Sequence, residues 1–123
     1  MTNTKNEAQA VRCVVQRYVE FSDTGDVEAL KTLFHPNALM SGYLMGELGI
    51  GSTQPFFEAV TNVTPDNSSE YVAEIGAIEV AGNAASATLV EKNFLGMNFV
   101  DYFHLIKEDG EWRIVSKTFN QGD

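Results

Sequence analysis

Four strand-like segments occupy the second half of the chain, and they limit its possible folds more than any other feature. Short turn sequences separate them, namely residues 81–84, Gly96 and the pair Asp109–Gly110. Strands joined by such short turns pair in an antiparallel manner. The sequence therefore predicts an antiparallel meander, with strands at residues 71–80, 85–95, 98–107 and 111–119.

Apolar residues in the first half recur at helical spacing instead. The first helix is expected at residues 5–23, followed by Gly25 as a left-handed stop. A second helix begins after a cap at Asp26 and ends at His35–Pro36, because the residue before proline disfavours helical geometry. A small hairpin is expected near residues 38–50, and a third helix, capped by Ser52, near residues 53–63.

Three helices ahead of a meander predict an α+β fold. The helices would pack on one face of a curved, highly twisted antiparallel sheet and enclose a pocket. The 123 residues suit one domain, residues 1–123, with a single core and therefore a single site.

Composition narrows the classes of partner. Eight Lys and Arg against 17 Asp and Glu give a net charge of −9, which repels nucleic acid and anionic membrane surfaces. The N-terminal residues lack an apolar signal core, so we expect a cytoplasmic protein. One cysteine and two distant histidines form no ligand motif, so neither a metal nor another cofactor is expected.

Three stretches of the sequence carry a resemblance to a known superfamily. They are residues 14–19 with Gly25–Asp26 and Leu33–Phe34, residues 100–103, and residues 109–115. The order of elements and these stretches resemble the nuclear transport factor 2-like superfamily, which includes ketosteroid isomerases, SnoaL-type polyketide cyclases and scytalone dehydratase. Within it, the chain looks most like the group labelled "putative lumazine-binding". The resemblance implies a cone-shaped, cystatin-like α+β roll.

Tyr18 and Asp101 are the catalytic candidates. Tyr18 lies in the apolar arc of the first predicted helix, where its hydroxyl needs a partner or a cavity. Asp101 lies between Phe99 and Phe103, where an ionised carboxylate is costly unless it is paired or at a pocket edge. By resemblance, Tyr18 and Asp101 occupy the places of the two groups that donate hydrogen bonds to the oxyanion in the isomerases. In those enzymes the aspartic acid is kept protonated. The alternatives are a packed tyrosine and a structural hydrogen bond.

The resemblance to the isomerases is incomplete at the catalytic base. Those enzymes carry a carboxylate on the strand after the second helix, and here residues 39–43 contain no acid. Glu47 and His35 flank this strand and are the remaining candidates for a base.

The register of the last hairpin decides where Lys117 points. A three-residue loop at Asp109–Gly110 with a glycine bulge places Lys117 opposite Asp101, whereas a two-residue turn sends it to the other face. We favour the paired register, in which Lys117 keeps Asp101 ionised. Asn120 and Gln121 would add polar groups at the rim.

The outer face of the same predicted strand carries Tyr102, His104 and Ile106. Such a face predicts a homodimer, which is also common in the superfamily.

The leading hypothesis is a binding pocket for a planar or polycyclic small molecule. An isomerase, cyclase or dehydratase that polarises a carbonyl with Tyr18 and Asp101 is one alternative, and a dimeric interaction module without a ligand is another. The predicted ligand-binding residues are Tyr18, Phe34, Met40, Phe57, Phe99, Asp101, Phe103, Lys117 and Phe119.

Overall fold

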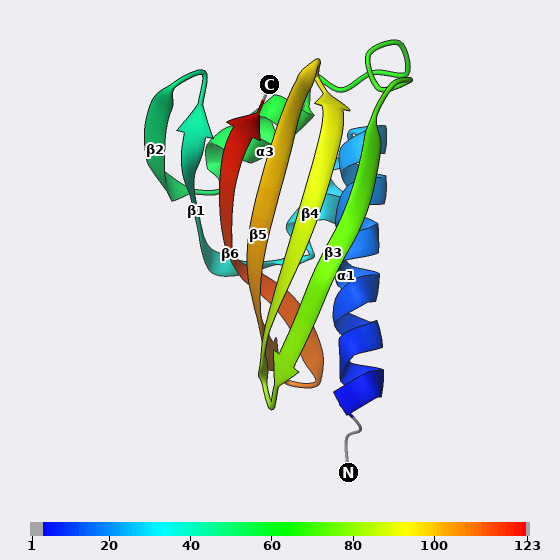
Figure 1. Ribbon diagram of the computed structural model, residues 1–123, viewed down its shortest axis with the longest axis vertical. Helices are drawn as coiled ribbons and strands as arrows, with labels where there is room; N and C mark the ends of the chain where they lie inside the picture. The colour runs from blue at the N-terminus through cyan, green and yellow to red at the C-terminus, as the bar shows by residue number, and fades with distance from the viewer. Residues whose placement is uncertain (1–3, 123) are drawn as a thin grey trace.

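The helices lie on one side of a twisted six-stranded sheet (Figure 1), which confirms the predicted α+β fold. The computed structural model describes residues 4–122 of the chain. The helices are α1 (Thr4–Thr24), α2 (Val27–Lys31) and α3 (Gln54–Val60). The strands are β1 (Phe34–Leu44), β2 (Glu47–Ser52), β3 (Val72–Ala81), β4 (Ala84–Phe94), β5 (Met97–Glu108) and β6 (Glu111–Gly122).

The stop and cap between the first two helices are those that the sequence predicts. Gly25 follows α1 with a φ of +71°, and the Asp26 side chain accepts a hydrogen bond of 3.1 Å from the Ala29 N–H. However, α2 ends at Lys31 rather than at His35–Pro36. The prediction was wrong here because Phe34 already pairs with Ile114 of β6, so sheet formation ends the helix before the proline does.

The third helix is shorter than predicted, and its cap is Thr53 rather than Ser52. The Ser52 hydroxyl still accepts a hydrogen bond of 3.3 Å from the Gln54 N–H near the helix start. Pro55 in the first turn presets helical geometry without losing a needed N–H.

The strands follow the order β2-β1-β6-β5-β4-β3, in which β3 to β6 form the predicted meander. One pairing differs from the antiparallel sheet that the sequence predicts, because β1 runs parallel to β6. After β1 the chain makes the β2 hairpin and α3, then crosses to the far edge to start β3. The meander therefore ends beside β1, and its last strand runs in the same direction (Figure 1).

A core fills the space between α1 and the concave face of the sheet. Its most deeply buried members come from the middle of α1 and from β4, β5 and β6. Burying each large apolar side chain contributes about 1.5–3 kcal/mol to the stability of the fold. These members include Val11, Val15, Leu89, Phe103, Leu105 and Ile114.

A β-bulge near the end of the chain determines which side chains of β6 face inward. The β5–β6 turn has two residues, with Glu108 opposite Glu111, and not the favoured three-residue loop. His104 then lies opposite Ser116 while Leu105 lies opposite Ile114, so Val115 is left without a partner. This extra residue shifts the alternation by one position.

The bulge brings Lys117 to the same face as Asp101, although a two-residue turn alone would have turned it away. Lys117 lies opposite Phe103, and Asp101 lies opposite Phe119. The predicted direct pairing of Lys117 with Asp101 is therefore wrong. The two residues are diagonal neighbours, which long side chains can still bridge.

Candidate functional site

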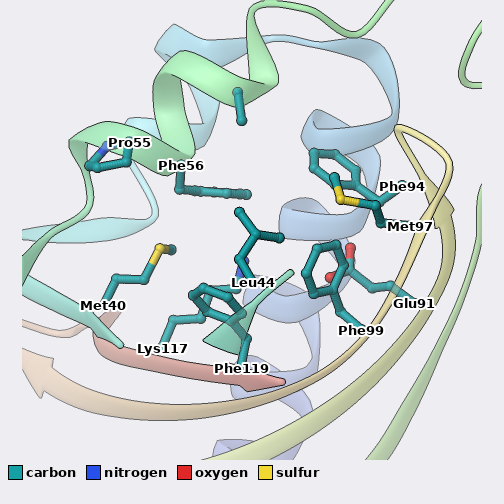
Figure 2. A pocket seen from close by; sticks show the side chains of 11 residues that line it. Met40, Leu44, Pro55, Phe56, Glu91, Phe94, Met97, Phe99, Lys117 and Phe119 are labelled. Carbon is teal, nitrogen blue, oxygen red and sulfur yellow. The ribbon is translucent and has the colours of Figure 1, made fainter. Parts of the chain in front are cut away.

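A cavity of about 130 Å³ lies between α3, the β1 strand and the concave face of the sheet (Figure 2). Among the described residues, nine of the lining side chains are apolar and two are ionisable, Glu91 and Lys117. The apolar ones are Met40, Leu44, Pro55, Phe56, Ala59, Phe94, Met97, Phe99 and Phe119.

A second cavity of about 210 Å³ adjoins the first and shares three of its residues, Met40, Pro55 and Phe119. Its remaining wall is the β2 hairpin, from Gly49 to Ser52. Methionine is flexible, so a rotation of Met40 can alter the passage between the two spaces.

Glycine at position 42 makes room for this arrangement. Gly42 pairs with Phe119, and a Cβ built on Gly42 would lie only 2.1 Å from the Phe119 carbonyl oxygen and 2.7 Å from its ring. The missing side chain lets the Phe119 ring lie close to β1 and form part of both cavity walls.

Lys117 reaches the cavity through aromatic surroundings. Its side chain is only 5% exposed, and Nζ lies 3.9 Å from the centroid of the Phe56 ring and 5.2 Å from that of Tyr18. The ion pairs found within residues 4–122 do not include Lys117. The ammonium group is thus held mainly against ring faces, which attract a cation.

Glu91 supplies the second ionisable group of the cavity. It extends inward from β4, is 2% exposed, and accepts a hydrogen bond of 2.5 Å from the Tyr71 hydroxyl. Burial raises the pKa of the Tyr71 phenol, and the negative charge of Glu91 adds to the increase. Tyr71 therefore remains a hydrogen-bond donor to Glu91 at ordinary pH.

Asp101 lies behind the cavity wall and is fully buried. Neither of its carboxyl oxygens accepts a hydrogen bond from an N–H or O–H group of the described residues. Burial raises the pKa of the Asp101 carboxyl well above its ordinary value; the positive charge of Lys117 opposes this, while a hydrogen bond to Glu91 and the charge of Glu91 support it. The raised pKa favours the protonated form of Asp101, and Glu91 is the neighbouring carboxyl that can accept a hydrogen bond from it.

Glu91 and Asp101 are diagonal neighbours on β4 and β5, since Glu91 pairs with Phe99 and Asp101 pairs with Leu89. The positive charge of Lys117 opposes the effect of burial on the Asp101 pKa. Glu91, Asp101 and Lys117 therefore form one buried cluster of ionisable side chains.

Sequence reasoning missed Glu91, although a signal was present. Alternation along β4 places Ala85, Ala87 and Leu89 inward, and Glu91 is the next residue on that face. An acid at an inward position is the same signal that identified Asp101.

The predicted ligand-binding residues divide into two groups. Met40, Phe99, Lys117 and Phe119 line the cavity. The others are buried but do not line the cavity. Asp101 lies behind the cavity wall, and the rest pack in the surrounding core, namely Tyr18, Phe34, Phe57 and Phe103.

Tyr18 is one layer further from the cavity than predicted. Its ring stacks on Phe56, with centroids 5.6 Å apart, and meets Phe103 edge-on at 4.9 Å. Burial raises the pKa of Tyr18, and the charges of Glu91 and Asp101 add to this. No hydrogen bond between Tyr18 and Asp101 is found in the described part of the chain, so Tyr18 positions the Phe56 wall.

His35 and Glu47, the two candidate bases, do not line the cavity. The His35 ring accepts a hydrogen bond from the Asn37 N–H, and its Nε2 lies 3.8 Å from Glu108. Glu47 is exposed at the start of β2. The β1 residues that line the cavity are Met40 and Leu44, so this strand supplies no base.

Of the remaining candidates, Asn120 and the outer face are exposed, and Gln121 is partly buried. Asn120 is on the surface, and the Gln121 side chain accepts a hydrogen bond of 2.6 Å from the Met45 N–H. Tyr102 is 51% exposed, and His104 and Ile106 lie on the same outer face, as predicted.

Two general classes of feature were also sought within residues 4–122. None of the helices there has both the length and the apolar character of a membrane span. No three His, Cys, Asp or Glu side chains in that range cluster as metal ligands would.

Comparison with known proteins gives a family. Residues 6–120 match the profile of the family described as "Putative lumazine-binding". The chain is also 31% identical over 118 residues to a protein named "Aldolase FrzH" from Cladobotryum sp, covering 95% of this chain and 93% of the relative.

Solved structures show the same fold. A nuclear transport factor 2-like protein of unknown function from Shewanella baltica OS155 has a TM-score of 0.89 at 28% identity, covering 100% of this chain and 99% of its own. A ketosteroid isomerase-like protein from Erwinia carotovora atroseptica matches in fold alone, with a TM-score of 0.70 at 14% identity, covering 95% and 97%. The chain belongs to the "Putative lumazine-binding" family of the nuclear transport factor 2-like superfamily, which confirms the resemblance.

Proposed function

We propose that this member of the "Putative lumazine-binding" family binds a small, mostly apolar molecule that carries a carbonyl oxygen. The observation behind the proposal is the pair of ionisable side chains, Lys117 and Glu91, on a wall that is otherwise apolar. Apolar walls with a few fixed polar groups are typical of small-molecule sites.

Lys117 is the polar anchor in this proposal. An ammonium group has three donors and no acceptor, and the ion pairs of the described residues leave it out. A carbonyl oxygen that enters the cavity can accept a hydrogen bond from it, and the apolar walls strengthen that bond by excluding water. An acidic side chain on the same wall disfavours anionic ligands, and Glu91 is such a side chain.

The volume indicates the size of ligand. About 130 Å³ is comparable to the roughly 150 Å³ cavity that accommodates benzene, so the inner space suits one ring. A planar or polycyclic ligand must extend into the adjoining 210 Å³ space past Met40. The two spaces together reach the lower end of the ~300–1,000 Å³ range of ligand pockets.

Binding can be tested with a matched pair of one-ring probes, cyclohexanone and methylenecyclohexane, which differ in the carbonyl oxygen. Chemical-shift titrations of the labelled protein should show saturable binding of cyclohexanone, with Met40, Phe99 and Phe119 most affected. Lys117→Met should weaken cyclohexanone about tenfold or more, since a hydrogen bond to a charged group contributes ~1.5–3 kcal/mol.

Lys92→Met is the matched control, because Lys92 is exposed on β4. It should leave the affinity unchanged. If cyclohexanone does not bind, or binds no better than methylenecyclohexane, the carbonyl site is refuted. Lumazine and flavin serve as larger probes of the planar-ligand hypothesis.

An enzyme of the aldol or proton-transfer kind is the second candidate, favoured by the relative named an aldolase. Such chemistry needs a group that polarises the carbonyl and a base that removes a proton from the adjacent carbon. Lys117 and Glu91 both line the cavity and supply these two roles. Tyr18 and Asp101, the pair predicted from the sequence, support these two residues from outside the cavity. Tyr18 packs against Phe56 of the cavity wall, and Asp101 lies beside Glu91.

This second candidate is tested by following the exchange of the α-hydrogens of cyclohexanone in D₂O by NMR. We expect exchange faster than in buffer, and we expect Glu91→Gln to remove the acceleration. Glu79→Gln, an exposed glutamate on β3, is the control. If the α-hydrogens exchange no faster than in buffer, the enzyme hypothesis is refuted and only the binding hypothesis remains.

A second copy of the chain is the proposed protein partner. It would cover the exposed outer face around Tyr102, which otherwise leaves aromatic surface in water.

A further inference from the structure

We propose that Lys117 reacts with the ligand carbonyl and forms an imine, so that the cavity is a covalent carbonyl site. The inference rests on the proposed function, namely that the ligand is a ketone or aldehyde. It adds a nucleophile to a site in which lysine would otherwise act only as a hydrogen-bond donor.

The position of the amine is the first argument. Lys117 follows the bulge in β6, so its side chain points inward, is almost fully buried, and still lines the cavity. A lysine amine buried against an apolar wall is the setting in which lysine reacts with carbonyl substrates. A carbonyl carbon in a cavity of this size lies within reach of the amine.

The ring faces around Nζ are the second argument. Phe56, Tyr18 and Phe119 lie 3.9, 5.2 and 5.6 Å from Nζ, measured to the ring centroids. An iminium ion keeps the positive charge near the position of the original ammonium nitrogen. The rings that stabilise the ammonium therefore also stabilise the iminium, and the cavity is complementary to the intermediate.

The carboxyl pair supplies the proton transfers. Asp101 is fully buried, and burial raises the pKa of its carboxyl, which favours the protonated form. The proton acceptor of the pair is therefore the Glu91 carboxylate, which lines the cavity together with Lys117. Asp101 lies beside Glu91 and can donate a hydrogen bond to it.

The atoms balance in the following sequence. The Lys117 ammonium gives one proton to the carboxylate pair, and the nitrogen lone pair attacks the carbonyl carbon. After proton transfer from nitrogen to oxygen the product is a carbinolamine. The carboxyl pair returns its proton to the carbinolamine hydroxyl, the carbon–oxygen bond breaks, and water leaves. The net change is ammonium plus ketone giving iminium plus water, and the carboxyl pair ends in its starting state.

The iminium gives the ligand a reactive adjacent carbon. Glu91 can remove an α-proton, and the electron pair of the carbon–hydrogen bond then forms an enamine while the nitrogen becomes neutral. This carbon attacks a second carbonyl carbon, the nitrogen lone pair re-forms the iminium, and the proton held by Glu91 passes to the new alkoxide oxygen. The substrate class is therefore enolisable ketones and aldehydes. Hydrolysis of the final iminium releases the product and restores the Lys117 ammonium.

Reductive trapping tests the inference directly. Wild-type protein is incubated with cyclohexanone and sodium cyanoborohydride, which reduces an iminium to a stable amine, and the product is analysed by intact mass and peptide mapping. We expect one cyclohexyl group per chain, on Lys117. Lys117→Arg, which keeps the cation in the aromatic surroundings, should remain unlabelled, and Lys92→Arg should be labelled like the wild type.

The carboxyl pair has its own readout. Glu91→Gln should slow trapping at saturating cyclohexanone at least tenfold while the chemical-shift titration still shows binding. An unchanged rate would remove Glu91 from the reaction sequence.

The trapping result separates this inference from the proposed function. If cyclohexanone binds in the titration but no adduct forms, or if adducts are spread evenly over exposed lysines such as Lys92, the imine is refuted and the binding site stands. If cyclohexanone does not bind at all, both proposals fail.

Discussion

Replacement of Asp101 by asparagine should make the protein more stable at neutral pH. The side chain is completely buried, and the titratable groups that face it are Glu91 on β4, Lys117 on β6 and Tyr18 on α1. Burial raises the pKa of Asp101 in the folded state, so the folded protein binds a proton that the unfolded chain has already released. Asparagine keeps the neutral shape and can donate a hydrogen bond to Glu91 without needing that proton.

The sign and size of the effect follow from proton linkage. A raised folded-state pKa contributes stability that is complete below the unfolded value of about 3.9 and is lost as the pH rises through the folded value. Between these two pH values the wild type should lose up to about 1.4 kcal/mol per pH unit relative to Asp101→Asn. The positive charge of Lys117 reduces the total loss, because it favours the ionised form and so lowers the folded-state pKa.

Urea denaturation between pH 4 and pH 8 measures the difference, with the fluorescence of Trp112, the single tryptophan, as the signal. Asp66→Asn, at an exposed loop position, is the matched control and should run parallel to the wild type at every pH. If Asp101→Asn instead loses stability relative to the wild type as the pH rises, Asp101 is ionised and paired with Lys117. The inference that burial favours the protonated form of Asp101 would then be wrong.

Three further predictions concern other parts of the structure. Gly42→Ala should destabilise the protein by about 1–3 kcal/mol and disturb the cavity, because its Cβ would collide with Phe119. Gly49 has open space around it, so Gly49→Ala should have nearly the same stability as the wild type in thermal melts. Light scattering should give twice 13.5 kDa for the wild type and about half that mass for Tyr102→Glu, and a monomeric wild type would leave the outer face unexplained. The protein should not isomerise a β,γ-unsaturated ketosteroid. Met40 stands on β1 where a base would be needed, and a steroid is larger than the 130 Å³ cavity. Turnover of the ketosteroid would show that the cavity opens.

Local signals in the sequence were sufficient for most of the fold. Gly25 and Asp26 mark the break between α1 and α2, and Asp109–Gly110 marks the last turn, because these residues act on their immediate neighbours. The parallel pairing of β1 with β6 had no such signal. It joins residues 77 to 80 positions apart, and it depends on where the whole meander ends.

The candidate site shows the same division between local and long-range information. Asp101 was found because an acid between two phenylalanines is visible within one strand, and Glu91 could have been found by the same alternation. The inward position of Lys117 depends on the bulge at Val115, which arises from pairing with β5 and not from the composition of β6. Tyr18 was placed correctly on its helix but one layer too close to the cavity, because Phe56 of α3 lies beside it.

The central claim is that the cavity between α3 and the sheet holds a one-ring carbonyl ligand, and filling that cavity tests it most directly. Ala59 lines the cavity from α3, while Glu58, its neighbour on the same helix, is exposed. Calorimetric titration with cyclohexanone should show binding to the wild type and to Glu58→Leu, and loss of binding in Ala59→Leu with the fold intact. Equal binding to all three proteins would place the ligand elsewhere and contradict the account.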